Sequence, residues 1–250
     1  MKHVLITGGA GGIGLAIARK FNADGARVLL CDVDDSALAR AREEMPAIIA
    51  VRCDVSRSED IAALFDTLTQ EFGTLDVLVN NVGIGGQTLP AETLPVDQWQ
   101  RVLDINLTGT FEVTQRAIPL LKQTAGTIIT LSSAAGRFGY PNRIAYSVSK
   151  WGLVGFAKTL AMELGSFGIT SNAILPGAVG GERFDRVIAG RAQLSGRSLA
   201  EEIEIGMTAQ SIKRIVQPGH IADLALFLTT EAGRHISGQM LCIDGDMQHS

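Results

Sequence analysis

The sequence predicts an α/β protein in which one parallel sheet is covered by helices on both faces. Short apolar runs rich in Val, Ile and Leu alternate with longer segments of helical periodicity. The runs are nearly continuous in apolar character, which is typical of strands buried on both faces. Repetition of strand and helix implies right-handed crossovers and parallel pairing. We therefore expect a doubly wound sheet of about seven strands in a single domain, residues 1–250, since no linker interrupts the pattern.

The expected strands lie at residues 3–7, 27–31, 48–53, 75–80, 127–132, 169–175 and 239–244. The expected helices lie near 13–24, 35–45, 57–72, 97–122, 144–167 and 219–231. Two stretches break the alternation, a Gly- and Pro-containing connection at 81–96 and a long excursion at 176–217. Both leave the carboxyl ends of strands, where open α/β sheets bind ligands. We expect residues 178–217 to cover the substrate.

Composition excludes several classes of partner. The 250 residues carry a net charge of −4 with no basic block, which argues against nucleic acid. No apolar run approaches the roughly 18 residues that span a bilayer, so no membrane partner is expected. The short apolar start is better explained as a first strand than as a signal peptide. Three scattered cysteines favour a reducing, cytoplasmic setting, and the four histidines lack metal-ligand spacing, so no metal is expected.

A glycine-rich segment, TGGAGGIG at residues 7–14, joins the first strand to the first helix. Glycines let the backbone turn tightly and approach a pyrophosphate, and the amino terminus of the helix adds unpaired N–H groups and a favourable dipole. Alone, such a loop also fits a simple flexible turn. The residues expected to contact a dinucleotide here are Gly8, Gly11, Gly12, Ile13 and Gly14.

Three further strand ends offer cofactor contacts. Asp32 follows Gly14 at close to the spacing of a carboxylate that accepts hydrogen bonds from an adenosine ribose. This carboxylate, followed by Val33 and by no Arg or Lys through position 36, would repel the 2′-phosphate of NADP, so NAD is the expected cofactor. The other candidates are Asp54 and Val55, which could also be ordinary strand-end residues, and Asn81 and Gly83 after the fourth strand.

The pair Tyr146 and Lys150 carries the strongest chemical signal. The segment AYSVSKWG has helical character, so a spacing of four residues puts both side chains on one face. A tyrosine phenol ordinarily ionises at a pH of about 10, and an adjacent ammonium favours the ionised form, which can act as a general base on an alcohol. Ser133 would hold the reacting oxygen. Ser132 is its rival, because only one of two neighbouring strand residues faces the site.

These residues together resemble the short-chain dehydrogenase/reductase family nearly end to end. The motifs are TGGAGGIG at 7–14, CDVS at 53–56, NNVG at 80–83, DINLTG at 104–109, LSSAAG at 131–136, YSVSK at 146–150 and NAILPG at 172–177. A single motif would be weak, whereas all of them in order are specific. The resemblance implies a Rossmann-like domain with a seven-stranded parallel sheet.

The resemblance also implies roles for individual residues. Tyr146 corresponds to the general acid/base and Ser133 to the residue that hydrogen-bonds the substrate oxygen. Lys150 corresponds to the residue that binds the nicotinamide ribose and favours the tyrosinate, and Asn106 to the one that holds a water in a proton relay. Tyr146 and Lys150 thus also count as cofactor contacts. Gly181 stands where the family often has a threonine that bonds the nicotinamide carboxamide, so the backbone near Val179 is the expected substitute.

The expected activity is NAD-dependent hydride transfer between nicotinamide and a small-molecule secondary alcohol or its ketone. The alternatives are a 3-oxoacyl-acyl-carrier-protein reductase that uses NADPH and, from a different class, a catalytically silent dinucleotide-binding regulator. Family members commonly form tetramers, so the resemblance implies a homotetramer. The excursion carries four arginines that could bind an anionic substrate or form a solvated helical face: Arg183, Arg186, Arg191 and Arg197.

Overall fold

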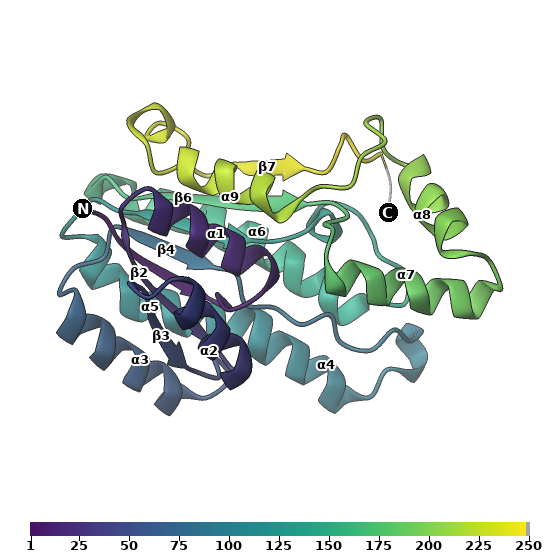
Figure 1. Cartoon of the computed structure of the whole chain (residues 1–250), viewed down its shortest axis with the longest axis horizontal. Helices are drawn as coiled ribbons and strands as arrows, with labels where there is room; N and C mark the ends of the chain where they lie inside the picture. Colours follow the sequence, from purple (N-terminus) through teal and green to yellow (C-terminus); the bar gives the residue numbers. More distant parts are fainter. Residues whose placement is uncertain (249–250) are drawn as a thin grey trace.

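The computed structural model describes residues 1–248; within that range the side chains at positions 182, 183, 191 and 194 lie outside the description. The described chain forms one sheet of seven parallel strands in the order β3-β2-β1-β4-β5-β6-β7 (Figure 1). The direction of winding reverses between β1 and β4, which is the switch point where doubly wound sheets open a crevice for ligands. The predicted fold class is confirmed.

The strands are β1 (His3–Thr7), β2 (Arg27–Asp32), β3 (Ile49–Arg52), β4 (Val77–Asn80), β5 (Thr127–Leu131), β6 (Thr170–Pro176) and β7 (Met240–Ile243). All seven lie within two residues of the segments expected from the sequence. In the centre of the sheet, Leu5 of β1 pairs with Leu29 of β2 on one side and with Leu78 of β4 on the other.

The helices that cover the sheet are α1 (Gly12–Ala23), α2 (Asp35–Glu44), α3 (Ser58–Glu71), α4 (Val96–Leu103), α5 (Gly109–Leu121), α6 (Ile144–Leu164) and α9 (Pro218–Phe227). The excursion holds α7 (Glu182–Ser195) and α8 (Leu199–Thr208). Short 3-10 turns form at Ala91–Thr93, Ala134–Gly136, Gly165–Phe167 and Glu231–Gly233. None of the helices in the described chain has the length and apolar character to cross a membrane.

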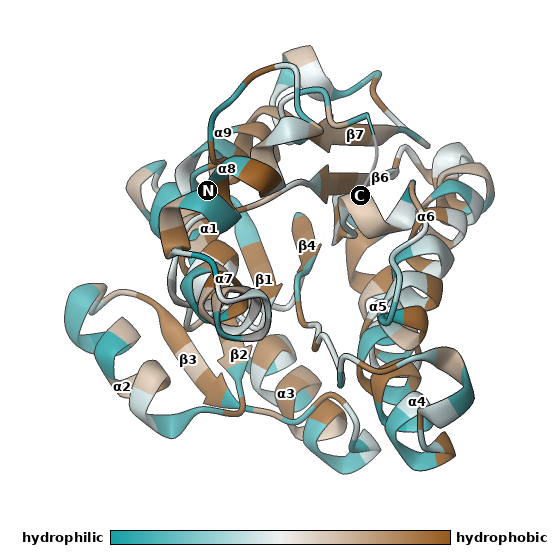
Figure 2. Ribbon diagram, turned by 90° about the vertical axis from the view of Figure 1, so that its right-hand side faces the viewer, coloured by the Kyte–Doolittle hydropathy of each residue, from teal (hydrophilic) through white to brown (hydrophobic). Residues whose placement is uncertain are grey.

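Successive residues of a central strand pack against opposite layers of helices. Val4 and Ile6 join a core with residues of α1, α2 and α9, whereas Leu5 between them joins a core with residues of α3, α5 and α6. All three side chains are fully buried. Figure 2 looks toward the carboxyl ends of the strands and shows these helices on the two sides of the sheet. Burial on both faces explains why the strands are continuously apolar.

One predicted helix differs from expectation. Residues 97–122 do not form a single regular helix, because a π-helical turn at Asp104–Thr108 separates α4 from α5. Such a turn inserts an extra residue into the helical repeat and frequently occurs at a functional site. Here it directs Asn106 into the interior, where the side chain is fully buried. The apolar periodicity stays helical on both sides of the turn, so the sequence pattern does not reveal it.

The excursion extends from the carboxyl edge of the sheet, and Figure 1 shows α7 and α8 beyond the strand ends. Its two ends meet, since Val179 and Val216 form a parallel bridge. The Val216 carbonyl accepts from Gly180 N at 2.9 Å, and Val216 N donates to the Ala178 carbonyl at 3.0 Å. A second bridge, between Gln210 and Met247, ties the end of the excursion to the segment after β7.

Candidate active site

The glycine-rich loop between β1 and α1 is shaped by positions that only glycine fills easily. Gly8 and Gly12 have φ values of +62° and +51°, where other residues are strained. At Gly14 an added Cβ would lie 2.2 Å from the Gly8 carbonyl oxygen, so the helix could not pack on the loop. At Gly11, in contrast, no described atom lies within 4 Å of such a Cβ. The loop is thus closed toward the protein and open on its outer side.

The amino terminus of α1 faces this open side. The first turn of α1, all of it described, carries no acidic residue, and Gly11 at the N-cap provides no side-chain hydrogen bond. Backbone N–H groups at a helix start have no partner within the helix and attract anions. Ile13, also predicted as a cofactor contact, is partly buried and packs against the core beneath the helix. This geometry fits a pyrophosphate.

Asn81, at the end of β4, holds the glycine loop in place. Its Nδ2 donates to the Gly8 carbonyl at 2.8 Å and to the Thr7 carbonyl at 3.1 Å. The Thr7 hydroxyl oxygen accepts a hydrogen bond from Asn81 N at 3.1 Å. The side-chain nitrogen of Asn81 is therefore used by the loop itself. Its predicted contact with a cofactor would have to come from another atom.

Asp32 lies where the ribose of an adenosine would be expected. One of its carboxylate oxygens accepts from Ala10 N in the glycine loop at 3.2 Å, and the other accepts from Val33 N at 2.8 Å. Val33 is half-exposed, with 53% of its surface accessible, and could form one wall for an adenine. The sequence argument overlooked Arg52, which pairs in register with Asp32 across the sheet. Its guanidinium lies 3.5 Å from the Asp35 carboxylate.

Asp54 and Val55 follow β3 on the same side. The Asp54 carboxylate accepts hydrogen bonds from the Ser56 backbone N–H at 2.9 Å and from its hydroxyl at 2.7 Å. Burial pushes the pKa of Asp54 upward, but the bonds from Ser56 and the cations Arg57 and Arg52 outweigh it and leave the pKa below its usual value. Val55 is buried in the core, so the apolar wall expected from it is largely covered.

Asn106, Gly83 and Lys150 come together from three separate segments. Asn106 Oδ1 accepts from Ile84 N at 2.8 Å, and its Nδ2 donates to the Ile84 carbonyl at 3.0 Å and to Ser149 Oγ at 2.9 Å. A Cβ on Gly83 would lie 3.2 Å from Lys150 Nζ and 3.5 Å from Asn106 Oδ1. The contact with Lys150 Nζ would be tight and that with Asn106 an ordinary one, so glycine at position 83 leaves room mainly for the lysine ammonium.

Tyr146 and Lys150 lie on one face of α6, as their spacing predicts. Lys150 Nζ is 5.7 Å from the centroid of the Tyr146 ring. The lysine is only 4% exposed, and its Nζ donates to the Leu131 carbonyl at the end of β5 at 2.8 Å. The ammonium is thereby held between the catalytic helix and the carboxyl edge of the sheet.

The structure separates the two neighbouring serines after β5. Ser132 is buried and its hydroxyl donates to the Lys150 backbone carbonyl at 2.7 Å, so it fastens the strand to α6. Ser133 is half-buried, and its oxygen accepts from Ala135 N at 3.2 Å. No residue in the described chain accepts a hydrogen bond from the Ser133 hydroxyl, so the hydrogen-bond pattern favours Ser133 as the residue that contacts substrate.

Arg143 and Tyr140 surround the acid/base candidate. The Arg143 guanidinium carbon lies 5.5 Å from the Tyr146 ring centroid, and the Tyr140 ring meets the Tyr146 ring edge to face at 6.4 Å. Sequence reasoning did not single out Arg143. Its position one helical turn before Tyr146 was the available signal, but such spacing alone is common.

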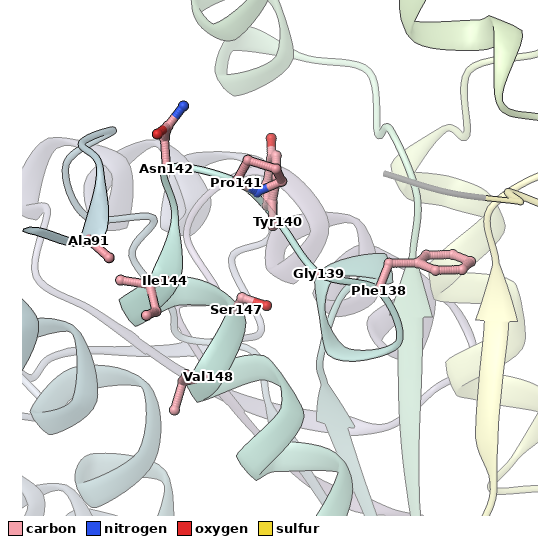
Figure 3. A pocket seen from close by; sticks show the side chains of 9 residues that line it. All are labelled: Ala91, Phe138, Gly139, Tyr140, Pro141, Asn142, Ile144, Ser147 and Val148. Atoms are coloured by element: carbon pink, nitrogen blue, oxygen red, sulfur yellow. The ribbon is translucent and has the colours of Figure 1, made fainter.

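An open groove of about 610 Å³ lies next to these residues (Figure 3). Its lining residues are Ala91, Phe138, Gly139, Tyr140, Pro141, Asn142, Ile144, Ser147 and Val148. Ser133, Tyr146 and Lys150 do not line it. Figure 3 shows it between the loop at 138–142 and the start of α6. The groove therefore borders the candidate catalytic residues and does not contain them.

In the excursion, Arg197 is paired with Glu202 at 3.3 Å and Arg186 is exposed. The side chains of Arg183 and Arg191 lie outside the described residues. Val179 is half-buried beside the bridge to Val216. Among the described residues, no cluster of three or more His, Cys, Asp or Glu side chains could hold a metal ion.

Comparison with known proteins identifies the family to which this chain belongs. The sequence model of the family described as enoyl-(acyl carrier protein) reductase matches residues 8–248. The trans-4-hydroxycyclohexanecarboxylate dehydrogenase of Sinomonas cyclohexanicum is 35% identical over an alignment that covers 98% of this chain and 92% of that protein. The chain belongs to the short-chain dehydrogenase/reductase family. As a member of this family it is an oxidoreductase of the nicotinamide-dependent type.

Solved structures of short-chain dehydrogenases/reductases superpose closely on the chain. An NAD⁺-bound xylitol dehydrogenase has a TM-score of 0.91 at 30% identity, with 98% of both chains covered. A variant of the actinorhodin polyketide ketoreductase with NADPH has a TM-score of 0.94 at 31% identity, covering 100% of this chain and 98% of the other. The two neighbours carry different cofactors, so the fold alone does not select between NAD and NADP.

Two departures from the short-chain dehydrogenase/reductase pattern have structural consequences. The family motif at residues 80–83 is usually NNAG, so Val82 replaces an alanine. Its side chain lies 3.1 Å from the site of a Cβ on Gly8, so the added bulk packs against the glycine loop. Gly181 has a φ of +130°, a conformation that a threonine would adopt only with strain. The backbone therefore takes a path at this position that the family threonine does not permit.

Proposed function

We propose that the protein is an NAD-dependent dehydrogenase that transfers a hydride between a secondary alcohol, or its ketone, and nicotinamide. The observation that carries the proposal is the convergence of Tyr146, Lys150 and Asn106 beside Gly83 at the same sheet edge as the glycine loop. These residues come from three segments: Tyr146 and Lys150 from α6, Asn106 from the π-helical turn and Gly83 from the connection after β4. Burial of an ammonium is unfavourable unless it is paired, so an ordinary apolar core would not place Lys150 there.

The chain's own residues fit a dinucleotide cofactor. The open N–H groups at the start of α1 suit the pyrophosphate, and Asp32 suits a ribose with free hydroxyls. When bound, the nicotinamide would supply the acceptor for the hydride. The proposed preference for NAD rests on Asp32, since a second negative charge at this point would be repelled. The nearest cation in register, Arg52, is engaged by Asp35 and Asp60.

In the proposed oxidation Tyr146 takes the proton of the substrate hydroxyl, and in reduction it returns a proton to the carbonyl oxygen. Ser133 donates a hydrogen bond to that oxygen while its charge changes. The Lys150 ammonium, 5.7 Å from the centroid of the Tyr146 ring, is placed to stabilise negative charge that develops during this transfer. Hydrogen bonds to Ile84 and Ser149 hold the Asn106 side chain in one orientation beside the lysine.

The decisive experiment is a cofactor-paired activity screen. Purified protein is assayed with NAD⁺ and with NADP⁺ against sugar alcohols, hydroxy acids, steroids and aryl carbinols. We expect turnover of at least one secondary alcohol, with kcat/KM higher for NAD⁺. A strong preference for NADP⁺ would remove the argument from Asp32. Tight NAD⁺ binding without turnover of any alcohol or ketone would instead support the silent regulator.

A second candidate is a 3-oxoacyl-acyl-carrier-protein reductase that uses NADPH. It is favoured by a relative named 3-oxoacyl-[acyl-carrier-protein] reductase, which is 34% identical to this chain, and by the NADPH in one similar structure. Relatives named for carbohydrate or hydroxy-acid substrates have comparable sequence identity to this chain. One of them is the L-fucose dehydrogenase of Bos taurus, at 32% identity. Assay with an acyl-carrier-protein substrate and both reduced cofactors separates the two candidates.

We further propose that the chain is a single domain in which the segment 178–217 covers a small-molecule substrate. The protein would act as a homotetramer in the cytoplasm. Large apolar side chains are exposed on α5 and α6, including Phe111, Val148 and Trp151, which favours burial against other copies. The three cysteines, all in the described part of the chain, form no disulfide, which suits a reducing compartment. Light scattering after size-exclusion chromatography tests the assembly: a monomeric mass contradicts it.

A further inference from the structure

Arg143 lies directly beside the acid/base candidate, and the mechanism above gives it no task. It immediately precedes α6, one turn before Tyr146. Its guanidinium carbon is 5.5 Å from the Tyr146 ring centroid and 5.6 Å from the Tyr140 ring centroid. Because the two rings are themselves in edge-to-face contact, the guanidinium rests against a preformed aromatic pair. The cation is therefore held beside the ring of the acid/base candidate.

A second contact fixes the same guanidinium from the opposite loop. Arg143 Nη1 donates to the Thr88 hydroxyl at 3.1 Å, and Thr88 belongs to the connection after β4. The next residue of this connection, Leu89, donates its N–H to the Asn142 carbonyl at 2.9 Å. Arg143 thus bridges the loops that follow β4 and β5. These are carboxyl-edge loops, where a substrate reaches the catalytic tyrosine.

The charge on Arg143 has no counter-charge in the described chain. None of the described carboxylates forms an ion pair with it, whereas Arg137, on the same loop, is paired with Asp244 at 3.3 Å. In addition, the Nε of Arg143 is buried and has no hydrogen-bond partner among the described residues. A buried donor without an acceptor is unfavourable and is usually explained by a ligand or a water. A guanidinium edge with an unpaired donor is suited to the two oxygens of a planar carboxylate.

We propose that Arg143 binds the carboxylate of a hydroxy-acid substrate, one or two carbons from the carbon that loses the hydride. This inference rests on the function proposed above, because it requires the substrate hydroxyl to lie between Tyr146 and Ser133. A substituent directed toward the start of α6 then meets the guanidinium. The keto acid formed by oxidation keeps the same charge, so the subsite serves both directions of the reaction.

The excursion arginines are weaker candidates for the same task. Arg197 is already paired with Glu202, and Arg186 is exposed on α7. An exposed arginine in water contributes little to anion affinity. Arg186 is nevertheless a useful matched control, because its side chain has the same charge and lies in the segment proposed to cover the substrate.

The test compares acids with their own uncharged amides. The probes are both enantiomers of lactate and 3-hydroxybutyrate, the corresponding lactamide and 3-hydroxybutyramide, and 2-butanol, each with NAD⁺. The proteins are the wild type, Arg143→Met, Arg143→Lys and Arg186→Met, with a thermal melt of each to verify folding. We expect the wild type to prefer the acid in at least one pair. Arg143→Met should lower the acid-to-amide ratio of kcat/KM by about 10- to 100-fold, mainly through KM.

The conservative variant and the control give the remaining outcomes. Arg143→Lys should restore part of the ratio, since it keeps the charge and loses the planar fork. Arg186→Met should leave the ratio unchanged. An equal loss on acid and amide in Arg143→Met would reduce Arg143 to a structural contact of the two tyrosines and overturn the proposal. A wild type that prefers the amide in every pair, or a ratio that depends on Arg186, would overturn it as well.

Failure of the proposed function has a different signature. In that case the wild type turns over neither these probes nor any alcohol or ketone of the cofactor-paired screen, although NAD⁺ binds, and both the activity and the carboxylate subsite are refuted. When any other alcohol reacts, 2-butanol and the amides included, and the acids gain nothing from Arg143, only the subsite is refuted.

Discussion

The cofactor side and the substrate side of the sheet edge are built in different ways. On the cofactor side, between β1 and β4, a short loop is fixed by hydrogen bonds to its own backbone, from Asn81 to Gly8 and from Ala10 to Asp32. On the substrate side, long segments are joined to one another by few contacts, such as Arg143 with Thr88 and Gln210 with Met247.

This difference in rigidity matches the ligands on the two sides, since the cofactor is constant and substrates vary. A dinucleotide has the same pyrophosphate and ribose in every reaction, so a rigid loop with fixed glycines suits it. Substrates differ, and loops carried on a rigid frame can change without loss of the fold. Tyr146 lies at the boundary, because it must address both the cofactor and the substrate. Variants on each side should therefore affect different measurements.

The largest effect is expected at the boundary. Tyr146→Phe should lower kcat by about 10²- to 10⁴-fold, because the proton acceptor is lost, while the affinity for NAD⁺ stays close to that of the wild type. Steady-state kinetics and NAD⁺ titration by fluorescence measure the two quantities. Tyr140→Phe, which alters the neighbouring ring and leaves the proposed base intact, is the matched control. Retention of a large share of wild-type kcat in Tyr146→Phe would contradict the mechanism.

Two glycines of the cofactor loop should separate stability from binding. Gly14→Ala places a Cβ 2.2 Å from the Gly8 carbonyl oxygen, so we expect a loss of about 1–3 kcal/mol in unfolding free energy together with weaker NAD⁺ binding. Gly11→Ala meets no described atom within 4 Å and should leave the melting temperature nearly unchanged. It should still weaken NAD⁺ binding, because the methyl group occupies the open side of the loop. Equal melting temperatures for the two variants would show that the loop is less rigid than described.

The cofactor preference should respond to one carboxylate. Asp32→Ser removes the charge that opposes a 2′-phosphate, and we expect the ratio of kcat/KM for NADP⁺ over NAD⁺ to rise by about 10- to 100-fold. The Ala10 N–H also loses its acceptor, so a moderate loss of stability should accompany the change. Asp35→Ser, which removes a nearby carboxylate beyond the ribose position, serves as control. An unchanged ratio in Asp32→Ser would place the discrimination elsewhere.

The smallest effects come from two helix caps on opposite sides. Asp34 caps α2, which packs on the core through Leu38, so Asp34→Ala should lower the melting temperature of the whole protein. Ser198 caps α8 in the excursion, and Ser198→Ala should cost about 1 kcal/mol locally, raise KM for substrate and leave the melting temperature almost unchanged. A raised KM in Asp34→Ala together with a lowered melting temperature in Ser198→Ala would contradict the proposed difference between the two sides.

The cap at Asp34 also has a defined pH dependence. Hydrogen bonds from the Ser36 hydroxyl and the Ala37 N–H hold the pKa of Asp34 below its usual value. A depressed folded pKa stabilises the protein above the unfolded pKa and loses this contribution as the pH falls through the folded value. The difference in melting temperature between the wild type and Asp34→Ala should therefore shrink below a pH of about 4. A difference that grows in acid would contradict the assigned cap.

The fold was predictable because its signals are local. Continuous apolar runs marked all seven strands, and the glycine spacing and the Tyr146–Lys150 spacing located both ends of the candidate site. The interruption at Asp104–Thr108 was missed because periodicity continues through it. The sequence left Ser132 and Ser133 open, and only the bond from Ser132 to the Lys150 carbonyl distinguishes them. Arg52 gained significance from Asp32 across the sheet and Arg143 from Thr88 in a distant loop, and no local pattern encodes either contact. The spacing of Arg143 from Tyr146 is local, but it is too common to indicate a role.

The meeting of Val179 and Val216 has a consequence for how such proteins diversify. The backbone enters and leaves the excursion through adjacent positions, so the helical part between them, α7 and α8, can change independently of the sheet. Its length and composition can change at small entropic cost, without a shift of β6 or β7. New specificities can accordingly arise by replacement of one contiguous stretch, while the proton-transfer residues, which are encoded upstream, are inherited intact.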